Sequence, residues 1–315
     1  MKESIHKILL ILWILGLVVF NLRDMGTLDP WILNEFRIPR ISGSLLSGMG
    51  LALSGLMMQT LFRNALAGPF LIGVTPGASL GMALYIFAGS TWGIGFSFLG
   101  SSLSSLAGAL LALGIQLWLS KGFESPMKLL LVGMVMGFVF SAGIQLLQQF
   151  GSAQEIQRFT FWGMGSFEQL KQGDWVLLLL PMLPITMILW LFRRHLDAYL
   201  LGDLYAQSSG VSLVKVRMLL ILGGAVLAGW ITSFAGPIGF VGLVAPHIAK
   251  RILQTESHAK ILMPTLLWGG ALCLSADTLA HHLLAQTVLP VNPITALIGA
   301  PVLLYGLLKR SSSAI

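Results

Sequence analysis

The chain has 315 residues, of which 56% are hydrophobic and only 10% are charged, and its mean hydropathy is +0.85. Soluble domains carry about 25% charged residues, so this composition excludes an ordinary soluble domain and indicates an integral membrane protein surrounded by lipid. The net charge of +7 comes from basic residues scattered between apolar runs, which indicates membrane topology rather than a nucleic-acid partner.

The apolar residues fall into ten stretches, which predicts an all-α, polytopic membrane protein with about ten transmembrane helices. A helix needs ~20 residues to cross the hydrocarbon core. The predicted segments are 5–22, 41–62, 70–89, 94–119, 127–150, 175–192, 218–235, 240–252, 261–284 and 294–308. The segment 240–252 is too short to span alone and predicts a half-helix. Pro76, among the glycines of segment 70–89, predicts a broken or bent helix, since irregular backbone at membrane depth usually lines a cavity.

Small residues line one face of two predicted helices. In segment 127–150, Gly133 and Gly137 lie one turn apart, and Ser141 follows on the same face. Segment 41–62 carries a similar set: Gly43, Ser47, Gly50 and Ser54. Such faces let helix backbones approach closely, and we expect this packing within the subunit rather than at a dimer seam.

Basic residues predict the orientation of the chain. If the N-terminus is cytoplasmic, fourteen of the 19 Lys and Arg residues fall on the cytoplasmic side, as the positive-inside rule requires. Both termini are then cytoplasmic. The polar stretch 200–217 also lies inside, whereas Arg37 and Arg40 lie outside.

The stretch 200–217 is polar in an otherwise apolar chain, and its pattern predicts a short amphipathic helix. Gly210 can take the left-handed conformation that ends such a helix, and Ser212 can cap a second helix running into the next span. The apolar face consists of three residues spaced i, i+3 and i+4: Leu201, Leu204 and Tyr205.

The sequence has no Walker A pattern and no His-Glu-x-x-His or Cys-x-x-Cys motif. His281 and His282 are adjacent and point to different faces of a helix, which favours interfacial histidines over metal ligands. We therefore expect no metal site in this chain. Asp277 is the one acid deep in an apolar context, and an intramembrane carboxylate is a candidate for ion coupling. A local pair with His281, one turn along, is the plainer interpretation.

Seven stretches, in order between residues 37 and 310, carry a resemblance to a known family. They are "RIPR" (37–40), "LSGLMMQTLFRNALAGPFLIGVTPGASLG" (53–81), "FWGMGSF" (161–167), "LGDLYAQSSGV" (201–211), "AGPIGFVGLVAPHIAKR" (235–251), "SADTLAHHLL" (275–284) and "LPVNPITALIGAPVLLYGLLKR" (289–310). Together they resemble the FecCD-type permeases of ABC importers, the family that takes up iron-siderophores, haem and cobalamin.

The resemblance implies a type II ABC importer permease, with residues 1–315 forming a single transmembrane permease domain. It implies a homodimer in the bacterial inner membrane, paired with two cytoplasmic ATP-binding subunits. A periplasmic or lipid-anchored substrate-binding protein would deliver the substrate from outside. This chain would be a transporter subunit rather than an enzyme and would hold no cofactor, because ATP and Mg²⁺ belong to the partner ATPase.

Three sites follow from matching residues to the family pattern. For docking of the binding protein, the resemblance implies Arg37 and Arg40, with His281 standing where the family has an arginine. The change to His281 weakens the third contact or makes it pH-dependent. For coupling to the ATPase, it implies the loop at about 193–217, with four positions of the family element: Gly202, Asp203, Ala206 and Gly210. Asp203 stands where the family has a glutamate.

The third site is the inner gate, which the resemblance places in "GFESPMK" (122–128), with Ser125 and Pro126 as its candidates. Ala65 replaces the proline of the family's Arg-Asn-Pro-Leu-Ala element. The expected function is permeation of a large iron chelate, a siderophore or haem. A cobalamin or molybdate permease of the same family is the alternative. From other classes, an ion-coupled secondary transporter that uses Asp277 and a membrane scaffold without transport stay open.

Overall fold

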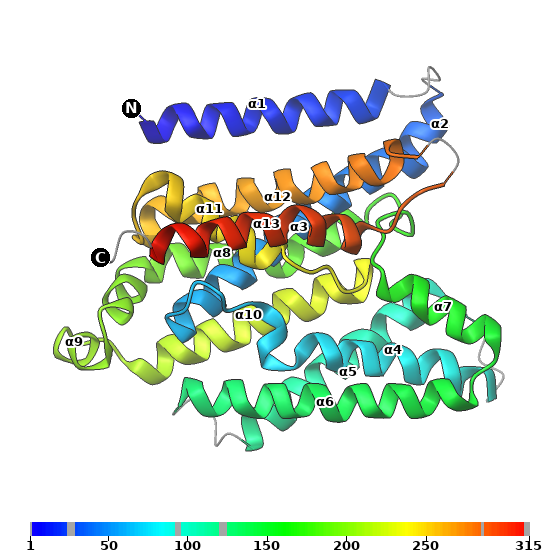
Figure 1. The fold of residues 1–315 in the computed structure, drawn as a ribbon, viewed down its shortest axis with the longest axis horizontal. Coiled ribbons are helices and arrows are strands. Elements are labelled where there is room, and N and C mark those ends of the chain that lie inside the picture. The colour runs from blue at the N-terminus through cyan, green and yellow to red at the C-terminus, as the bar shows by residue number, and fades with distance from the viewer. Residues whose placement is uncertain (1, 24–28, 92–95, 120–124, 285–286, 312–315) are drawn as a thin grey trace.

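The computed structural model describes residues 2–23, 29–91, 96–119, 125–284 and 287–311, and no strand occurs within these ranges. The helices in chain order are α1 (Lys2–Arg23), α2 (Pro30–Ile32), the π-helix η1 (Leu33–Arg37), α3 (Ile38–Phe62), the 3₁₀-helix η2 (Pro69–Ile72), α4 (Val74–Thr91), α5 (Phe98–Leu119), α6 (Pro126–Phe150), α7 (Ala153–Gly163), α8 (Asp174–Leu200), α9 (Asp203–Ser208), α10 (Leu213–Ala235), α11 (Val241–Leu253), α12 (His258–His282) and α13 (Val291–Ser311). The long helices run along one common direction and form a bundle (Figure 1).

Nine of the ten predicted segments each coincide with one helix, and segment 70–89 comprises η2 and α4. Among the described residues, seven helices are long and apolar enough to cross a membrane, and two shorter apolar stretches, Val74–Gly89 and Val291–Leu304, lie in α4 and α13. The short segment is α11, which has 13 residues. The prediction of an all-α protein with about ten membrane helices is therefore confirmed.

The two ends of the bundle carry different elements. The N-terminal end of α1, helix α9 and the connection from α11 to α12 lie at the left end in Figure 1, whereas α2 and α7 lie at the right end. The C-terminal end of α13 also lies at the left. We call the left end the α9 end and the right end the α7 end.

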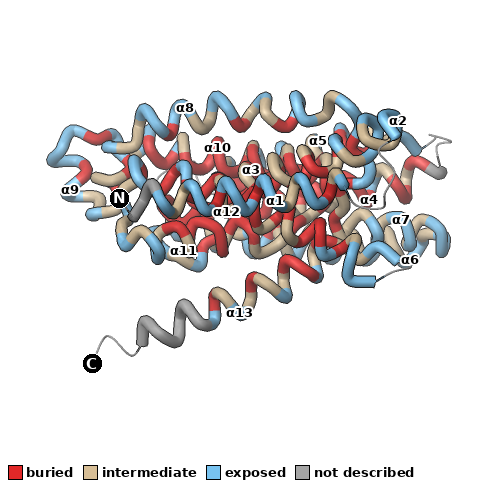
Figure 2. Tube along the Cα trace, turned by 90° about the horizontal axis from the view of Figure 1, so that it is seen from above, coloured by how far each residue is buried: buried red, intermediate tan, exposed pale blue. Residues whose placement is uncertain are grey.

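Helix α3 forms the centre of the bundle. Of its most apolar 18-residue stretch, 78% is buried, against 17% in each of α1, α6 and α8. Figure 2 shows the buried residues concentrated in α3 and the helices around it. Glycines make this possible, because a Cβ on Gly48 would collide with Gly269 of α12 and one on Gly55 with Gly242 of α11. Without side chains at these positions the backbones approach closely and gain packing contacts.

The small-residue face of α6 also packs inside the subunit. A Cβ on Gly133 would collide with the carbonyl oxygen of Leu71, and one on Gly137 would contact Pro76. The expectation that this face packs within the chain is met at both glycines.

The predicted break in segment 70–89 lies at Gly73. The 3₁₀-helix η2 ends there with a φ of 68°, in the left-handed region, and α4 begins at Val74. Pro76 therefore lies in the first turn of α4, where its missing N–H costs no hydrogen bond. The glycine, rather than the proline, bends the chain.

Two helices extend further than the sequence predicted. Helices α2, η1 and α3 are continuous from Pro30 to Phe62, so Arg37 and Arg40 lie within a helix instead of preceding a span that begins at 41. Helix α8 continues to Leu200 instead of ending at 192. It continues because its buried face extends beyond the adjacent Arg193 and Arg194, through Leu196 and Tyr199.

Helix α7 was not predicted at all. It is amphipathic and only 11 residues long, so it lacks the apolar run that marks a span. Ser152 and Glu155 form a capping box at its start, in which each side chain bonds the other residue's backbone N–H. That local signal, S-x-x-E, could have identified it.

Candidate functional site

Helix α9 is a short helix between two glycines with positive φ. Gly202 precedes it with a φ of 117°, and Gly210 follows it with a φ of 79°. The Gly210 N–H donates to the Gln207 carbonyl (2.9 Å) and the Val211 N–H donates to the Ala206 carbonyl (2.9 Å), which closes the helix as predicted. Ala206 is its single buried residue among six. Ser212 then caps α10 by accepting from the Lys215 N–H, also as predicted.

The apolar face of α9 is uncovered in this chain. Leu204 is 85% exposed, and Leu201 and Tyr205 are also exposed. Beside this face lies an open groove of about 460 Å³ between the end of α8 and the start of α12. The groove is lined by Arg194, Asp197, Ala198, Leu200, Leu201, Tyr205, Glu256 and Ser257. Apolar side chains rimmed by charges are typical of a surface that another protein covers.

Asp203 joins α9 to two other helices. One carboxylate oxygen accepts from Arg63 at the end of α3, and the other accepts from Nη2 of Arg217 in α10 at 2.6 Å. Partial burial works against ionisation of Asp203, but the hydrogen bond and charge of Arg63, with the charge of Arg217, outweigh it. They lower the pKa of Asp203 below its ordinary value.

Tyr199, the penultimate residue of α8, organises the two arginines. Its hydroxyl donates to the Leu61 carbonyl (3.1 Å), and its own carbonyl accepts from Nε of Arg63 (2.9 Å). The Arg63 guanidinium lies over its ring at 4.2 Å from the centroid, a cation–π contact. Nε of Arg217 donates to the Tyr199 hydroxyl at 3.4 Å.

A second polar group ties α8, α12 and α3 together at the same end. Asp197 accepts from the backbone N–H of His258 (2.8 Å) and contacts its Nδ1 at 2.6 Å, and Ser257 donates to the same carboxylate at 2.9 Å. The other ring nitrogen of His258 lies 2.9 Å from the Thr60 hydroxyl. The acid–His–hydroxyl order resembles a hydrolytic triad. Thr60 is fully buried and donates to the Leu56 carbonyl, so no substrate reaches it and the group serves to hold the helices together.

At the α7 end, Arg37 and Arg40 turn back toward the bundle. Nη1 of Arg37 donates to the Leu22 carbonyl of α1 at 2.7 Å, and Nη2 of Arg40 donates to Asn21 at 3.0 Å. Nε of Arg40 lies 3.3 Å from the Asp277 carboxylate, and the Arg40 side chain is only 16% exposed.

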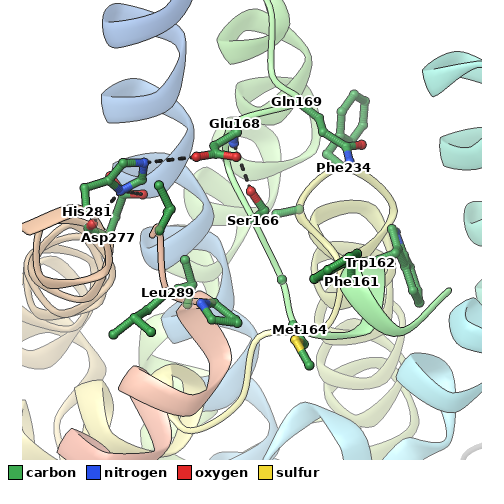
Figure 3. A pocket seen from close by; sticks show the side chains of 15 residues that line it. Phe161, Trp162, Met164, Ser166, Glu168, Gln169, Phe234, Asp277, His281 and Leu289 are labelled. Carbon is green, nitrogen blue, oxygen red and sulfur yellow. Dashed lines mark hydrogen bonds and ion pairs between the residues drawn. The ribbon is translucent and has the colours of Figure 1, made fainter. Parts of the chain in front are cut away.

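Asp277, His281 and Glu168 form a chain of charges at the same end (Figure 3). Asp277 is fully buried, and Nδ1 of His281 lies 3.6 Å from its carboxylate, so the predicted local pair is present. Nε2 of His281 lies 3.3 Å from the carboxylate of Glu168, a contact that the sequence did not predict. The hydrogen bond from His281 lowers the pKa of Glu168, against the opposing effect of its partial burial.

A cavity of about 330 Å³ opens beside this charge chain. Its walls come from the end of α7, the segment that follows it and the segment before α13, and they include Trp162, Met164 and Leu289 (Figure 3). The cavity combines aromatic walls with charged groups. The stretch "FWGMGSF" therefore lies at the α7 end, together with the predicted docking residues.

The predicted gate residues lie at the start of α6. Ser125 caps the helix by accepting from the Lys128 N–H, and Pro126 occupies its first turn. The preceding residues of "GFESPMK", 122–124, lie outside the described residues. Ser125 and Pro126 thus have a local role as a helix start, and their role as a gate stays a prediction.

Sequence reasoning missed Arg63, Arg217 and Tyr199. A signal for Arg217 existed, because an arginine among the apolar residues that begin a span needs a carboxylate partner. No comparable signal pointed to Arg63, which follows the apolar run of α3 as an ordinary interfacial cation would.

Comparison with known proteins relates the whole chain to one group. The model of the FecCD transport family matches residues 8–309. The iron(3+)-hydroxamate import system permease protein FhuG of Bacillus subtilis (strain 168) is 34% identical over 292 residues, covering 90% of this chain and 85% of the relative. The vitamin B12 import system permease protein BtuC of Escherichia coli O157:H7 (strain EC4115 / EHEC) is also 34% identical, over 291 residues, with the same shares covered.

Two solved structures share the fold. One is an inward-facing structure described as a metal-chelate type ABC transporter, which is 31% identical with a TM-score of 0.86 and covers 98% of this chain and 99% of its own. The other is PsaBC from Streptococcus pneumoniae in complex with Fab, at 16% identity and a TM-score of 0.55, covering 93% of this chain and 95% of its own. The second likeness concerns the fold alone.

Proposed function

This chain belongs to the FecCD transport family, and we propose on that premise that it is the permease subunit of an ATP-driven importer for a large iron chelate, a siderophore or haem. The subunit works as a homodimer in the cytoplasmic membrane of a bacterium, with both termini in the cytoplasm. The observation that carries the proposal is α9, a short helix bounded by two glycines, whose apolar face is left uncovered at the α9 end of the bundle.

Two ATP-binding subunits cover the exposed face of α9, one on each permease. ATP and Mg²⁺ bind in those partners, and this chain holds no cofactor. The uncovered leucines and the neighbouring groove with Arg194 and Glu256 supply the apolar centre and charged rim that such an interface needs. Closure of the ATPases then moves α9 and changes access to the path between two permeases. Ser125 and Pro126, at the start of α6, stay the candidates for its inner gate.

A substrate-binding protein docks at the α7 end, where Arg37, Arg40 and His281 lie. Charged contacts across such an interface fix orientation and encounter rate more than affinity. Here His281 already holds Glu168 and Arg40 already faces Asp277. A carboxylate from the binding protein that contacts His281 therefore replaces Glu168, whose side chain is 53% exposed and able to move away.

An iron chelate is the proposed substrate because a hydroxamate import permease is among the similar relatives. A vitamin B12 permease reaches the same identity, so cobalamin is the alternative, and molybdate is a further one. The choice among them depends on the binding protein that delivers the substrate.

Uptake by proteoliposomes tests the proposal. The vesicles contain the permease and its ATPase partner, and a ferric hydroxamate, haem, cyanocobalamin or molybdate is supplied outside on a binding protein. We expect uptake of a ferric chelate that requires Mg²⁺ and ATP and persists when ionophores collapse the ion gradients. Uptake that is driven by an ion gradient without ATP, and is abolished by Asp277→Asn, would contradict the proposal and indicate an ion-coupled carrier.

Gly210→Leu tests the role of α9 within that assay. Gly210 has a φ of 79°, which a leucine rarely adopts, so the variant distorts the end of α9. Gly114→Leu is the matched control, because a Cβ at that position in α5 meets nothing within 4 Å. We expect ATP-driven uptake to be lost in the first variant and kept in the second; full uptake by both would count against docking at α9.

A further inference from the structure

Helix α9 has little packing of its own to hold it in place. It has six residues, and only Ala206 is buried. Gly202 and Gly210, which flank it, both have positive φ and lack the side chains that would restrict rotation at either end. A force applied to the exposed face of α9 would therefore be lost as rotation about these glycines, unless another contact resists it.

Asp203 provides that contact, because its carboxylate bridges the end of α3 and the start of α10. The two acceptors are used separately, one by Arg63 and the other by Arg217. Both are charge-assisted hydrogen bonds, the stronger and more directional class. The Asp203 side chain is 41% exposed, whereas Arg217 is buried, so the bridge runs from the protein surface into the bundle.

Arg63 is held in an unusual way to make this contact. It ends α3 with a φ of 49°, in the left-handed region that residues other than glycine seldom occupy. Its guanidinium lies on the Tyr199 ring while Nε donates to the Tyr199 carbonyl. The side chain is thereby fixed at two points before it reaches Asp203, which favours a defined position over a loose surface ion pair.

The helices that Asp203 contacts lead into the interior. Helix α3 is the centre of the bundle and meets α12 at Gly48 and Gly269, where no side chain separates the backbones. At the α7 end the same two helices are joined again by Arg40 and Asp277. A displacement of α3 at Arg63 is thus a displacement of a closely packed pair of helices.

We propose that Arg63 and Arg217 are positioning residues that fasten α9 to α3 and α10 through Asp203, so that movement of α9 is delivered to the membrane helices. The inference rests on the proposed function for the source of that movement. It assigns to two arginines a role in coupling ATP hydrolysis to transport, with no contact to nucleotide or substrate.

Local opening of α9 can be measured in the isolated permease by amide hydrogen exchange at residues 206–211. We expect Arg63→Gln and Asp203→Asn each to speed exchange there by roughly tenfold or more, because local opening becomes easier. The double variant should exchange no faster than Asp203→Asn alone, because Asp203→Asn already removes the ion pair with Arg63. Lys260→Gln is the control, because it removes an exposed positive charge at the same end of the bundle. Unchanged exchange in Arg63→Gln would overturn the inference, and the measurement needs no ATPase.

Coupling is measured as substrate imported per ATP hydrolysed in proteoliposomes. We expect Arg63→Gln and Arg217→Gln to assemble with the ATPase and hydrolyse ATP, but to import at least about tenfold less substrate per ATP. Asp203→Glu should keep normal coupling, because its longer side chain still presents a carboxylate to both arginines. A role in folding alone would instead lower the amount of complex and leave this ratio unchanged. Wild-type uptake without ATP would contradict the proposed function. ATP-driven uptake with an unchanged ratio in the arginine variants would contradict the present inference alone.

Discussion

The contact between Gly48 and Gly269 makes a direct test of the central helix pair. In Gly48→Ala the new Cβ would lie 2.8 Å from the carbonyl carbon of Gly269 and 2.5 Å from the Cβ of Cys273. Carbon atoms in van der Waals contact are separated by about 3.5–4.0 Å. Because the first neighbour is backbone, it cannot rotate away, and α3 and α12 must separate by roughly 1 Å.

Overpacking of this kind costs about 1–3 kcal/mol. Replacement of a helical glycine by alanine returns about 0.5–1 kcal/mol through helix propensity, so the net loss is about 0–2.5 kcal/mol. With the scaling of domains of 150–250 residues, about 2–4 °C per kcal/mol, Tm should fall by up to about 10 °C. Separation of the helices also strains Arg40–Asp277 at one end and Thr60–His258 at the other, which places the value toward the upper part of that range.

Thermal unfolding of the purified permease in detergent measures the effect. Gly114→Ala is the control, because a Cβ there meets nothing within 4 Å and should leave Tm unchanged or raise it slightly. Equal Tm values for Gly48→Ala and Gly114→Ala would refute the close approach of α3 and α12.

Three further predictions follow from charged groups. The pKa of Asp203 is lowered in the folded protein, so its stabilising contribution is complete above the ordinary carboxyl value and is lost as pH falls through the lower folded value. The difference in Tm between wild type and Asp203→Asn should therefore be constant between about pH 5 and 8 and smallest in strong acid. Asp197→Ala removes the carboxylate that accepts from the His258 N–H at the start of α12, and loss of such a cap should lower the free energy of unfolding by about 1–2 kcal/mol. Tm should therefore drop in Asp197→Ala, and it should drop less in Asp197→Asn, whose amide oxygen can still accept from this N–H. Asp277→Ala breaks a buried ion pair and should lower the free energy of unfolding by about 3–5 kcal/mol. Glu168→Gln breaks a half-exposed pair and should lower it by at most about 1 kcal/mol. Equal drops in Tm for the two variants would contradict the assigned burial.

The features predicted correctly from the sequence are those that depend on neighbouring residues. Gly210 ends α9 because a left-handed residue is needed there, and Ser212 begins α10 because its hydroxyl can reach the N–H three residues on. The positions of the helices followed from the lengths of apolar runs. Each of these rules acts within about one or two turns of helix, so the sequence contains all that is needed.

The partners of Asp203 could not be predicted in this way. Arg63 lies 140 positions before it, and the contact exists only because α3 ends beside α8 and α9. The same holds for Arg40 and Asp277, which meet across the α3–α12 contact. Pairs of this kind depend on which helices are neighbours, and a pattern along one chain does not specify that.

The proposed function requires that an ATPase acts on this permease at the exposed face of α9. The single native cysteine, Cys273, is fully buried, so a Leu204→Cys variant can be labelled selectively with a maleimide. Glu35→Cys, exposed at the α7 end, is the control. We expect a stoichiometric complex with the ATPase to be labelled at Leu204→Cys at least about tenfold more slowly than the free permease, with no change at Glu35→Cys. Equal labelling of Leu204→Cys with and without the bound ATPase would contradict it.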